Sequence, residues 1–83
     1  MSLMKACCIH DVKAEAWMTP MFFQSNGQAV RSFGDAVRDS SSDFGKHPED
    51  YHLYIVGEFN PQTGELVGMP PVHLIHGANI LEV

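Results

Sequence analysis

The stretch YHLYIVGEFNPQTGELVGM, residues 51–69, constrains the fold of this chain more than any other. It contains two apolar runs separated by a turn, in which Asn60 and Pro61 come first and Gly64 comes last. That order is typical of a type I turn closed by a left-handed residue, which joins two antiparallel strands. We therefore predict a hairpin whose first strand is apolar on both faces and so lies in the middle of its sheet.

Side-chain alternation predicts which residues of the hairpin share a face. Residues two apart lie on the same side of a strand, so Leu53, Ile55 and Phe59 are expected together on one face. Pro70 and Pro71 cannot donate backbone hydrogen bonds to a sheet. We therefore expect the second strand to end where they begin.

One amphipathic helix is predicted upstream of the hairpin, over residues 27–39. Apolar residues recur at helical spacing from Ala29 to Val37, and Ser25 with Gln28 has the spacing of an N-terminal capping box. Before the helix we predict a sheltered strand at 4–11, a loop carrying Trp17 at 12–20 and a short edge segment at 21–24. After it we predict a polar loop with a proline-led turn at 39–50, and a closing segment at 72–83 that is compatible with a short helical turn and a strand.

The order of these elements predicts an α+β fold. A helix between two successive strands favours a right-handed parallel crossover, and the hairpin adds an antiparallel edge. The expected architecture is a small two-layer sandwich with one main helix on a mixed or antiparallel sheet of about three to five strands, with a β-α-β-β core. We expect a single domain over residues 4–83, with residues 1–3 a cloning remnant before Met4.

The size of the chain limits how it can be stabilised and where it can reside. A chain of 83 residues buries a smaller share of its surface than a large domain does, so we expect a homodimer. The sequence contains no apolar run near the ~20 residues of a membrane span, and its start does not resemble a secretory signal. The expected compartment is a cytoplasm.

Charge is unevenly distributed along the chain. The net charge is −5, and all five bases lie in the first 46 residues, where five acids balance them. The five remaining acids are unopposed. Nonspecific binding of nucleic acid depends on Lys and Arg neutralising phosphates, so this composition disfavours it in a monomer.

Cysteine and histidine spacing gives no sign of a metal centre. Adjacent Cys7 and Cys8 are interpreted as sheltered thiols of a reducing compartment. His73 and His76 form H-x-x-H, which supplies at most two of the roughly four ligands of zinc, and only if the segment is helical. We expect no metal and no cofactor.

A polar group at His47, Glu49 and Asp50 could be an acid–base cluster or a turn. Pro48 between them suits the first position of a helical turn, and this interpretation explains the same residues without chemistry. The sequence also has no phosphate-cradling glycine loop and no nucleophile elbow. We therefore expect a protein that is not an enzyme, with these three residues as candidates for contact with a partner.

The aromatic residues give the candidate binding surfaces. Tyr51, Tyr54 and Phe59 could stack bases as sheet platforms do, although the aliphatic residues between them favour a place in the core. Trp17 is the residue most expected to contact a partner, because tryptophan is enriched at the energetic centres of interfaces.

The motif HPEDY-x-L-Y-x-x-GEF, followed by a T-G turn, resembles the small nonstructural protein of the microviruses, in the branch that includes the gokushoviruses. The resemblance extends upstream through MKACCIHDVKAEAW and PMFFQSNGQAVRSFGDAVRD and covers roughly residues 4–67. These phages have circular single-stranded DNA genomes. The resemblance implies a nonstructural, DNA-binding protein in the host bacterial cytoplasm that acts in the switch from duplex replication to single-strand synthesis for packaging.

The resemblance supplies no catalytic residues, and it leaves two hypotheses. In the first, the chain binds single-stranded DNA, with candidate contacts at Lys13, Arg31, Arg38, Lys46, Tyr51 and Tyr54. In the second, it is an acidic adaptor that contacts the replication initiator, a host replication protein or a procapsid component through Trp17, His47, Glu49 and Asp50. Salt dependence distinguishes them, because phosphate binding weakens steeply with salt.

Overall fold

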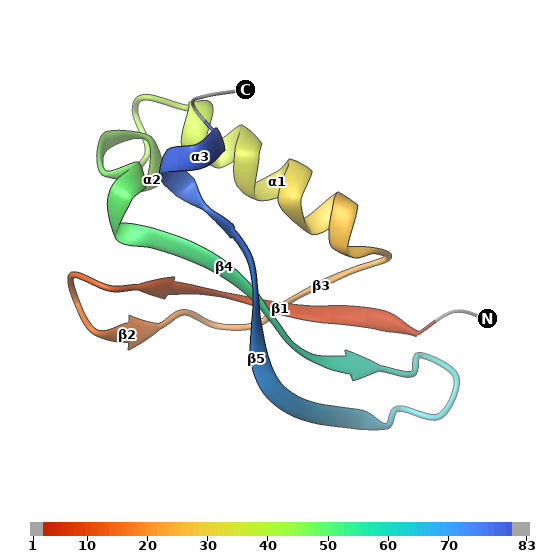
Figure 1. The fold of residues 1–83 in the computed structure, drawn as a ribbon. Helices are drawn as coiled ribbons and strands as arrows, with labels where there is room; N and C mark the ends of the chain where they lie inside the picture. The colour runs from red at the N-terminus through yellow and green to blue at the C-terminus, as the bar shows by residue number, and fades with distance from the viewer. Residues whose placement is uncertain (1–2, 81–83) are drawn as a thin grey trace.

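The computed structural model describes residues 3–80 as two layers, with the helices gathered on one side of a β-sheet (Figure 1). Over these residues the sheet is antiparallel and five-stranded, in the order β2-β1-β4-β5, with β3 also pairing β1. This confirms the predicted α+β class and the antiparallel alternative. The elements are β1 (Met4–Asp11), β2 (Ala16–Trp17), β3 (Met21–Phe23), α1 (Asn26–Arg38), α2 (Asp43–Lys46), the 3-10 turn η1 (Pro48–Asp50), β4 (Tyr51–Phe59), β5 (Leu66–His76) and α3 (Gly77–Ile80).

The predicted parallel crossover is wrong, because β1 and β4 run antiparallel. Asp11 lies opposite Tyr51, and Met4 lies opposite Phe59. The cause is β3, which takes the chain back along β1 until Phe23 lies opposite Lys5. The helix α1 therefore begins near the start of β1 and crosses the sheet toward its end, where β4 sets out in the opposite direction.

The predicted loop at 12–20 contains the short strand β2. Asp11 closes the preceding turn, since its carboxylate accepts hydrogen bonds from the backbone N–H groups of Lys13 and Ala14, and Glu15 adopts a left-handed φ of 56°. Trp17 then pairs with His10. A two-residue strand has too little side-chain pattern to be recognised in the sequence.

The helix α1 follows the prediction closely. Ser25 is its N-cap, and its hydroxyl accepts a hydrogen bond from the Gln28 N–H at 3.1 Å. The Gln28 side chain reaches back one residue further than in a standard capping box and accepts from the Gln24 N–H. The buried residues include Ala29, Phe33 and Val37, which face the sheet as the predicted apolar stripe.

The predicted polar loop at 39–50 contains a second helical turn, α2, which was not predicted. Ser42 caps it by accepting a hydrogen bond from the Gly45 N–H. Phe44 in this turn packs edge-to-face on Phe33 and on Tyr51. The proline-led turn is confirmed as η1, and Tyr51 belongs to the edge of the core.

The predicted hairpin is confirmed, but a bulge changes which of its residues share a face. Ala6 pairs with Gly57 and Cys7 pairs with Ile55, so Val56 is an extra residue on β4. A bulge reverses side-chain alternation beyond it. Phe59 consequently leaves the face of Leu53 and Ile55, which corrects the prediction, and its ring lies 5.6 Å from that of Phe22.

The strand β5 continues through Pro70 and Pro71, contrary to the prediction that it ends there. The register with β4 slips at this point, with Gly57 opposite Gly68 and Ile55 opposite Val72. Proline is tolerated on an edge strand and at bulges, where its missing N–H disturbs no ladder. The closing segment is thus strand to His76 and then the turn α3, while residues 81–83 and 1–2, with most of the expected cloning remnant, lie outside the described residues.

The core lies between the sheet and α1, and its buried members come from β1, β4, α1 and α3. Buried side chains from the sheet meet buried side chains from α1 and α3; they are Cys7, Ile9, Leu53 and Ile55 from the sheet, Ala29, Phe33 and Val37 from α1, and Ile80 from α3. Within residues 3–80 the helices cover one face only, and no helix lies over the opposite face of the sheet (Figure 1).

Candidate functional site

The side of the sheet away from the helices, here called the outer face, carries most of the aromatic and histidine side chains. Strand alternation places them there, because each lies next to a residue of the core. Cys7, Ile9 and Leu53 point into the core. Their neighbours on the outer face are Cys8, His10, His52 and Tyr54.

Four rings form a continuous row across the outer face, here called the aromatic row: Trp17, His10, Tyr54 and His73. Trp17 stacks on His10 with ring centroids 4.4 Å apart and an angle of 26° between the planes. Tyr54 packs edge-on against Trp17 at 4.9 Å and against His73 at 5.2 Å. Trp17 remains 48% exposed, so the flat ring of a ligand can contact its indole while the neighbouring side chains keep their positions.

His73, at the end of this row, also belongs to a group of three histidines, here called the histidine cluster: His52, His73 and His76. His52 Nδ1 and His73 Nε2 share a hydrogen bond of 2.9 Å. The rings of His52 and His76 are parallel, with centroids 3.9 Å apart. His76 Nε2 donates to the backbone carbonyl of Glu49 at 2.8 Å, because a carbonyl oxygen can only accept.

A bulge on β5 brings two members of this cluster to the same face. Leu53 pairs with Ile75 and Tyr54 pairs with His73, so Leu74 is an extra residue. Residues three apart in a regular strand lie on opposite faces. The extra residue restores the alternation, so His73 and His76 of H-x-x-H lie on the same face of a strand, whereas the sequence had suggested that only a helix would bring them together.

Burial and the neighbouring histidines depress the pKa of His52. Desolvation is the larger cause, and the charges that His76, His73 and His10 would carry are the others. Burial also raises the pKa of the Cys8 thiol, which keeps this cysteine in its unreactive protonated form. The outer face is therefore apolar and uncharged around Tyr54 when its histidines are neutral.

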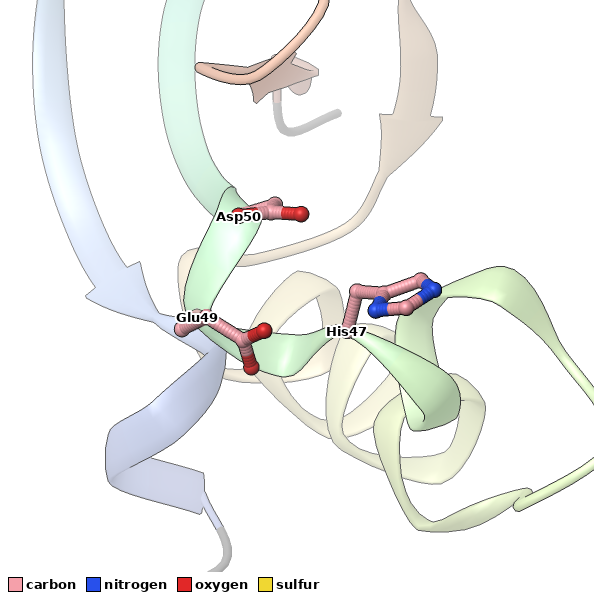
Figure 2. A group of neighbouring side chains, drawn as sticks. All are labelled: His47, Glu49 and Asp50. Atoms are coloured by element: carbon pink, nitrogen blue, oxygen red, sulfur yellow. The ribbon is translucent and has the colours of Figure 1, made fainter.

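A separate, acidic hollow lies where β1 ends and β4 begins, and Figure 2 shows three of the side chains there. The structure places the ligand atoms of His47, Glu49 and Asp50, the predicted partner-binding candidates, within 4.8 Å of one another. Asp11, Asp43 and Lys13 also line the hollow of about 630 Å³.

The acidic hollow can be explained by the turn alone. Burial and then the charges of Asp11, Asp43 and Asp50 raise the pKa of Tyr51, so the electrostatic potential there is negative. The three donors of Figure 2 could hold a cation, yet exposed carboxylates cluster in this way in many turns. Glu49 and Asp50 also belong at the start of η1, where acids are favourable.

The predicted cationic contacts do not lie on the outer face. Arg31 and Arg38 project from α1 and Lys46 from α2, so they belong to the helix layer (Figure 1). Lys13 lines the acidic hollow. The structure therefore separates the predicted cations from Tyr54, and it places Tyr51 on the core side beside Phe44.

Sequence reasoning chose two residues of the aromatic row for different reasons and missed the others. Tyr54 was a candidate for nucleic acid and Trp17 for a protein partner, and the structure brings their rings into contact. His10 and His52 were not singled out. Period-two alternation would have placed His10 with Cys8 and His52 with Tyr54, but their contact requires the register between β1 and β4.

Two further surfaces are apolar. A hollow of about 360 Å³ between α1 and the β1–β3 side is lined mainly by apolar residues, with Thr19 and Ser32 as its polar members. The strand β5 pairs with β4 only and exposes Leu66, Val67, Met69 and Val72. This edge strand carries no Asp, Glu, Lys or Arg.

Comparison with known proteins connects the chain to phages. A family model described as phage ORF5 protein matches residues 4–80. No curated protein and no solved structure matches the chain. Within residues 3–80, none of the helices has the length and apolar character needed to cross a membrane.

Proposed function

This chain belongs to the phage ORF5 protein family, and from that premise we propose that it is a non-enzymatic accessory protein that binds single-stranded DNA through the outer face of its sheet. Its expected setting is the bacterial host of a microvirus, where it would act in viral DNA replication, single-strand synthesis or packaging. One observation carries the proposal: the stack of Trp17, which is exposed, with the half-buried His10 and Tyr54, on the face that no helix of residues 3–80 covers.

The chemistry of this face suits unpaired bases. Stacking of a base on an aromatic side chain contributes about 1–3 kcal/mol and tolerates any sequence, since every base has a π-face. The bases of a duplex are already stacked on one another and cannot reach a flat protein surface. A preference for single strands over duplex follows from these two facts.

The position of the charges supports binding through bases more than through phosphates. Arg31, Arg38 and Lys46 lie in the helix layer, and Lys5 is paired with Glu58 at 2.7 Å. Salt dependence is steep only when many phosphates are neutralised by Lys and Arg. We therefore expect affinity for single strands to fall only weakly as salt is raised.

The proposal is tested by fluorescence, because Trp17 is the single tryptophan of the chain. Titration with unlabelled oligothymidylate should quench its emission if a base stacks on the indole, and anisotropy of labelled single-stranded and duplex oligonucleotides gives the affinity. Tyr54→Ala should weaken single-strand binding at least tenfold, matching one lost base stack of about 1–3 kcal/mol. The matched control is His47→Ala, in the acidic hollow.

Two outcomes would contradict the proposal. One is the absence of any binding to single strands at low salt, where electrostatic attraction is least screened. The other is equal loss of affinity in the Tyr54 variant and in the His47 control with both folded by circular dichroism. The second outcome would mean that the loss of affinity is not specific to the aromatic row.

We propose an acidic adaptor as the second candidate function, because of the exposed edge of β5. A long uncharged edge strand presents unpaired backbone groups to another chain, and here Leu66, Val67 and Val72 add apolar contact area. A second copy paired antiparallel along β5 would form the expected homodimer. A phage or host replication protein would then bind elsewhere, at Trp17 or the acidic hollow.

Sedimentation equilibrium tests this second candidate. Val67→Lys places a charge on the edge, a device that natural proteins use against strand pairing, and it should convert a dimer to a monomer. The control Val12→Lys introduces the same charge at another exposed valine and should leave the dimer intact. A wild-type monomer at high concentration would contradict dimerisation through β5.

A further inference from the structure

We propose that the histidine cluster is a phosphodiester-binding site of the outer face, which binds a backbone phosphate of single-stranded DNA with the uptake of a proton. The inference rests on the proposed function, because bases stacked on the aromatic row would bring their phosphates to His73, whose ring contacts Tyr54. The imidazoles of the cluster would take the place of Lys and Arg as the phosphate-binding groups of this face.

The need for such a group follows from where the cations lie. Every lysine and arginine of the chain lies within residues 3–80, and each is placed in the helix layer, in the acidic hollow or, for Lys5, in an ion pair with Glu58. Four histidines are placed on the outer face instead: His10, His52, His73 and His76. Protonated imidazole donates from both ring nitrogens and carries the charge that a phosphate requires.

The hydrogen bond between His52 and His73 sets how many protons this pair of the cluster can hold. In the hydrogen bond between His52 Nδ1 and His73 Nε2, one nitrogen donates and the other accepts. If both rings were protonated, two N–H groups would point at each other, so this pair accommodates one added proton and not two. One positive charge matches the single negative charge of a phosphodiester.

The same geometry disfavours a metal ion at this place. The centroids of His52 and His73 are 5.1 Å apart while the bonded nitrogens are 2.9 Å apart, so the rings point almost straight at each other. A metal ion would require both lone pairs to converge on a third point. Sharing a proton is what the arrangement favours.

The titratable neighbours of the cluster determine the direction of the pH dependence. His10 and Cys8 face it from β1, Tyr54 from β4, and η1 contributes the carbonyl of Glu49 together with the carboxylates of Glu49 and Asp50 at the adjoining turn. Burial and the neighbouring imidazoles depress the pKa of His52 in the free protein. An anion beside the ring would oppose both effects, so binding draws in a proton.

The sign of the effect on affinity is fixed by this linkage. When the bound state holds one proton more than the free state, the dissociation constant falls about tenfold for each unit that the pH decreases, within the range where the free cluster is neutral. The effect levels off once the free cluster is itself protonated. Affinity for single strands should therefore rise from pH 7.5 to pH 5.5.

The inference is tested by titrating the full chain with oligothymidylate at about pH 7.5, 6.5 and 5.5 and at constant ionic strength. Binding is measured by the quenching of Trp17 fluorescence. Thymine takes up no proton in this range, so a change in affinity belongs to the protein. The wild type should gain about tenfold per pH unit. His73→Gln, on the exposed edge strand, should bind equally at all three pH values, and His47→Gln, the matched control, should keep the wild-type slope.

The outcomes separate this inference from the proposed function. A wild type that binds at no pH overturns both. A wild type that binds with the same affinity at every pH leaves single-strand binding standing and overturns the proton-coupled site. If the pH dependence of affinity persists in both His73→Gln and His76→Gln, the histidine cluster is not the proton-coupled site. If either variant folds poorly, calorimetry of the wild type in buffers of different ionisation enthalpy counts the proton taken up on binding directly.

Discussion

Phe33 joins the two layers of this protein more directly than any other single residue. Its side chain is 3% exposed, and it contacts both the sheet core and the ring of Phe44. It therefore links α1 to the sheet and to the turn α2.

We predict that Phe33→Ala lowers the free energy of unfolding by about 3–5 kcal/mol, the usual cost of emptying a buried phenylalanine site. For a domain of this size such a loss leaves little stability. Chemical denaturation measures it. The control Phe22→Ala removes a ring that is 42% exposed, and a similar loss in both variants would argue against the core described above.

Gly57 is a position where the sheet leaves no room for a side chain. A Cβ built there would lie 2.5 Å from the carbonyl oxygen of Val67 on the paired strand. Backbone atoms of a hydrogen-bonded ladder cannot move aside as the end of a flexible side chain can.

Gly57→Ala is predicted to destabilise the protein by about 1–3 kcal/mol, the typical cost of overpacking. Gly27→Ala is the control, because a Cβ there meets only the Ser25 hydroxyl at 3.8 Å. That control should be neutral or stabilising, since alanine favours helix by up to ~1 kcal/mol over glycine. Equal melting temperatures for the two variants would contradict the tight pairing of β4 and β5.

At the scale of elements, β4 and β5 are shaped by their irregularities. The bulge at Val56 moves Phe59 to the outer face, and the bulge at Leu74 places His73 and His76 there together. The strand β4 thus supplies Leu53 and Ile55 to the core, while its other residues and the bulged part of β5 form the proposed binding face. This arrangement makes stability sensitive to protonation of the outer face.

We predict that the free energy of unfolding decreases as the pH falls from about 7 to 5. The pKa of His52 is lower in the folded than in the unfolded protein, where it is about 6.5. The unfolded state therefore binds more protons below that value, and the stability present above it is lost as the pH falls through the folded pKa. Urea denaturation at several pH values measures the decline.

The matched variants for this prediction are His52→Gln and His47→Gln. The first should flatten the decline between pH 7 and 5, whereas the second, on an exposed turn, should retain it. If His52→Gln keeps the full wild-type decline, another group is responsible.

At the scale of the whole molecule, the two layers differ in chemistry. The helix layer carries Arg31, Arg38 and Lys46, and the outer face carries the aromatic row and the histidine cluster. A chain with a net charge of −5 attracts DNA poorly over long distances. Any affinity for single strands must therefore arise from short-range contacts on one face.

Reversal of two helix-layer charges tests this separation. Arg31→Glu with Arg38→Glu changes the net charge from −5 to −9, because each reversal removes one positive and adds one negative charge. We predict that affinity for oligothymidylate at physiological salt changes less than threefold, since charges on the opposite layer are largely screened beyond ~8 Å. Abolished binding in this folded variant would place the DNA on α1.

Local sequence patterns determined the elements whose signals are complete within a short segment. The apolar stripe of α1 and the cap at Ser25 specify a helix by themselves, and Asn60 to Gly64 specify the hairpin, with Gly64 at φ 79° as its left-handed residue. The α+β class follows from their order. The short strand β2 and the turn α2 escaped prediction because each has too few residues to show a period.

Only the tertiary structure decided the direction of β4 and the composition of the outer face. Both depend on register between strands, which is set by pairing between distant segments and by the bulges at Val56 and Leu74. A slip of one residue moves every following side chain to the other face. For that reason Trp17, Tyr54, His73 and His76 could be singled out in the sequence, whereas the contacts among their rings, and those with His10 and His52, are a property of the folded sheet.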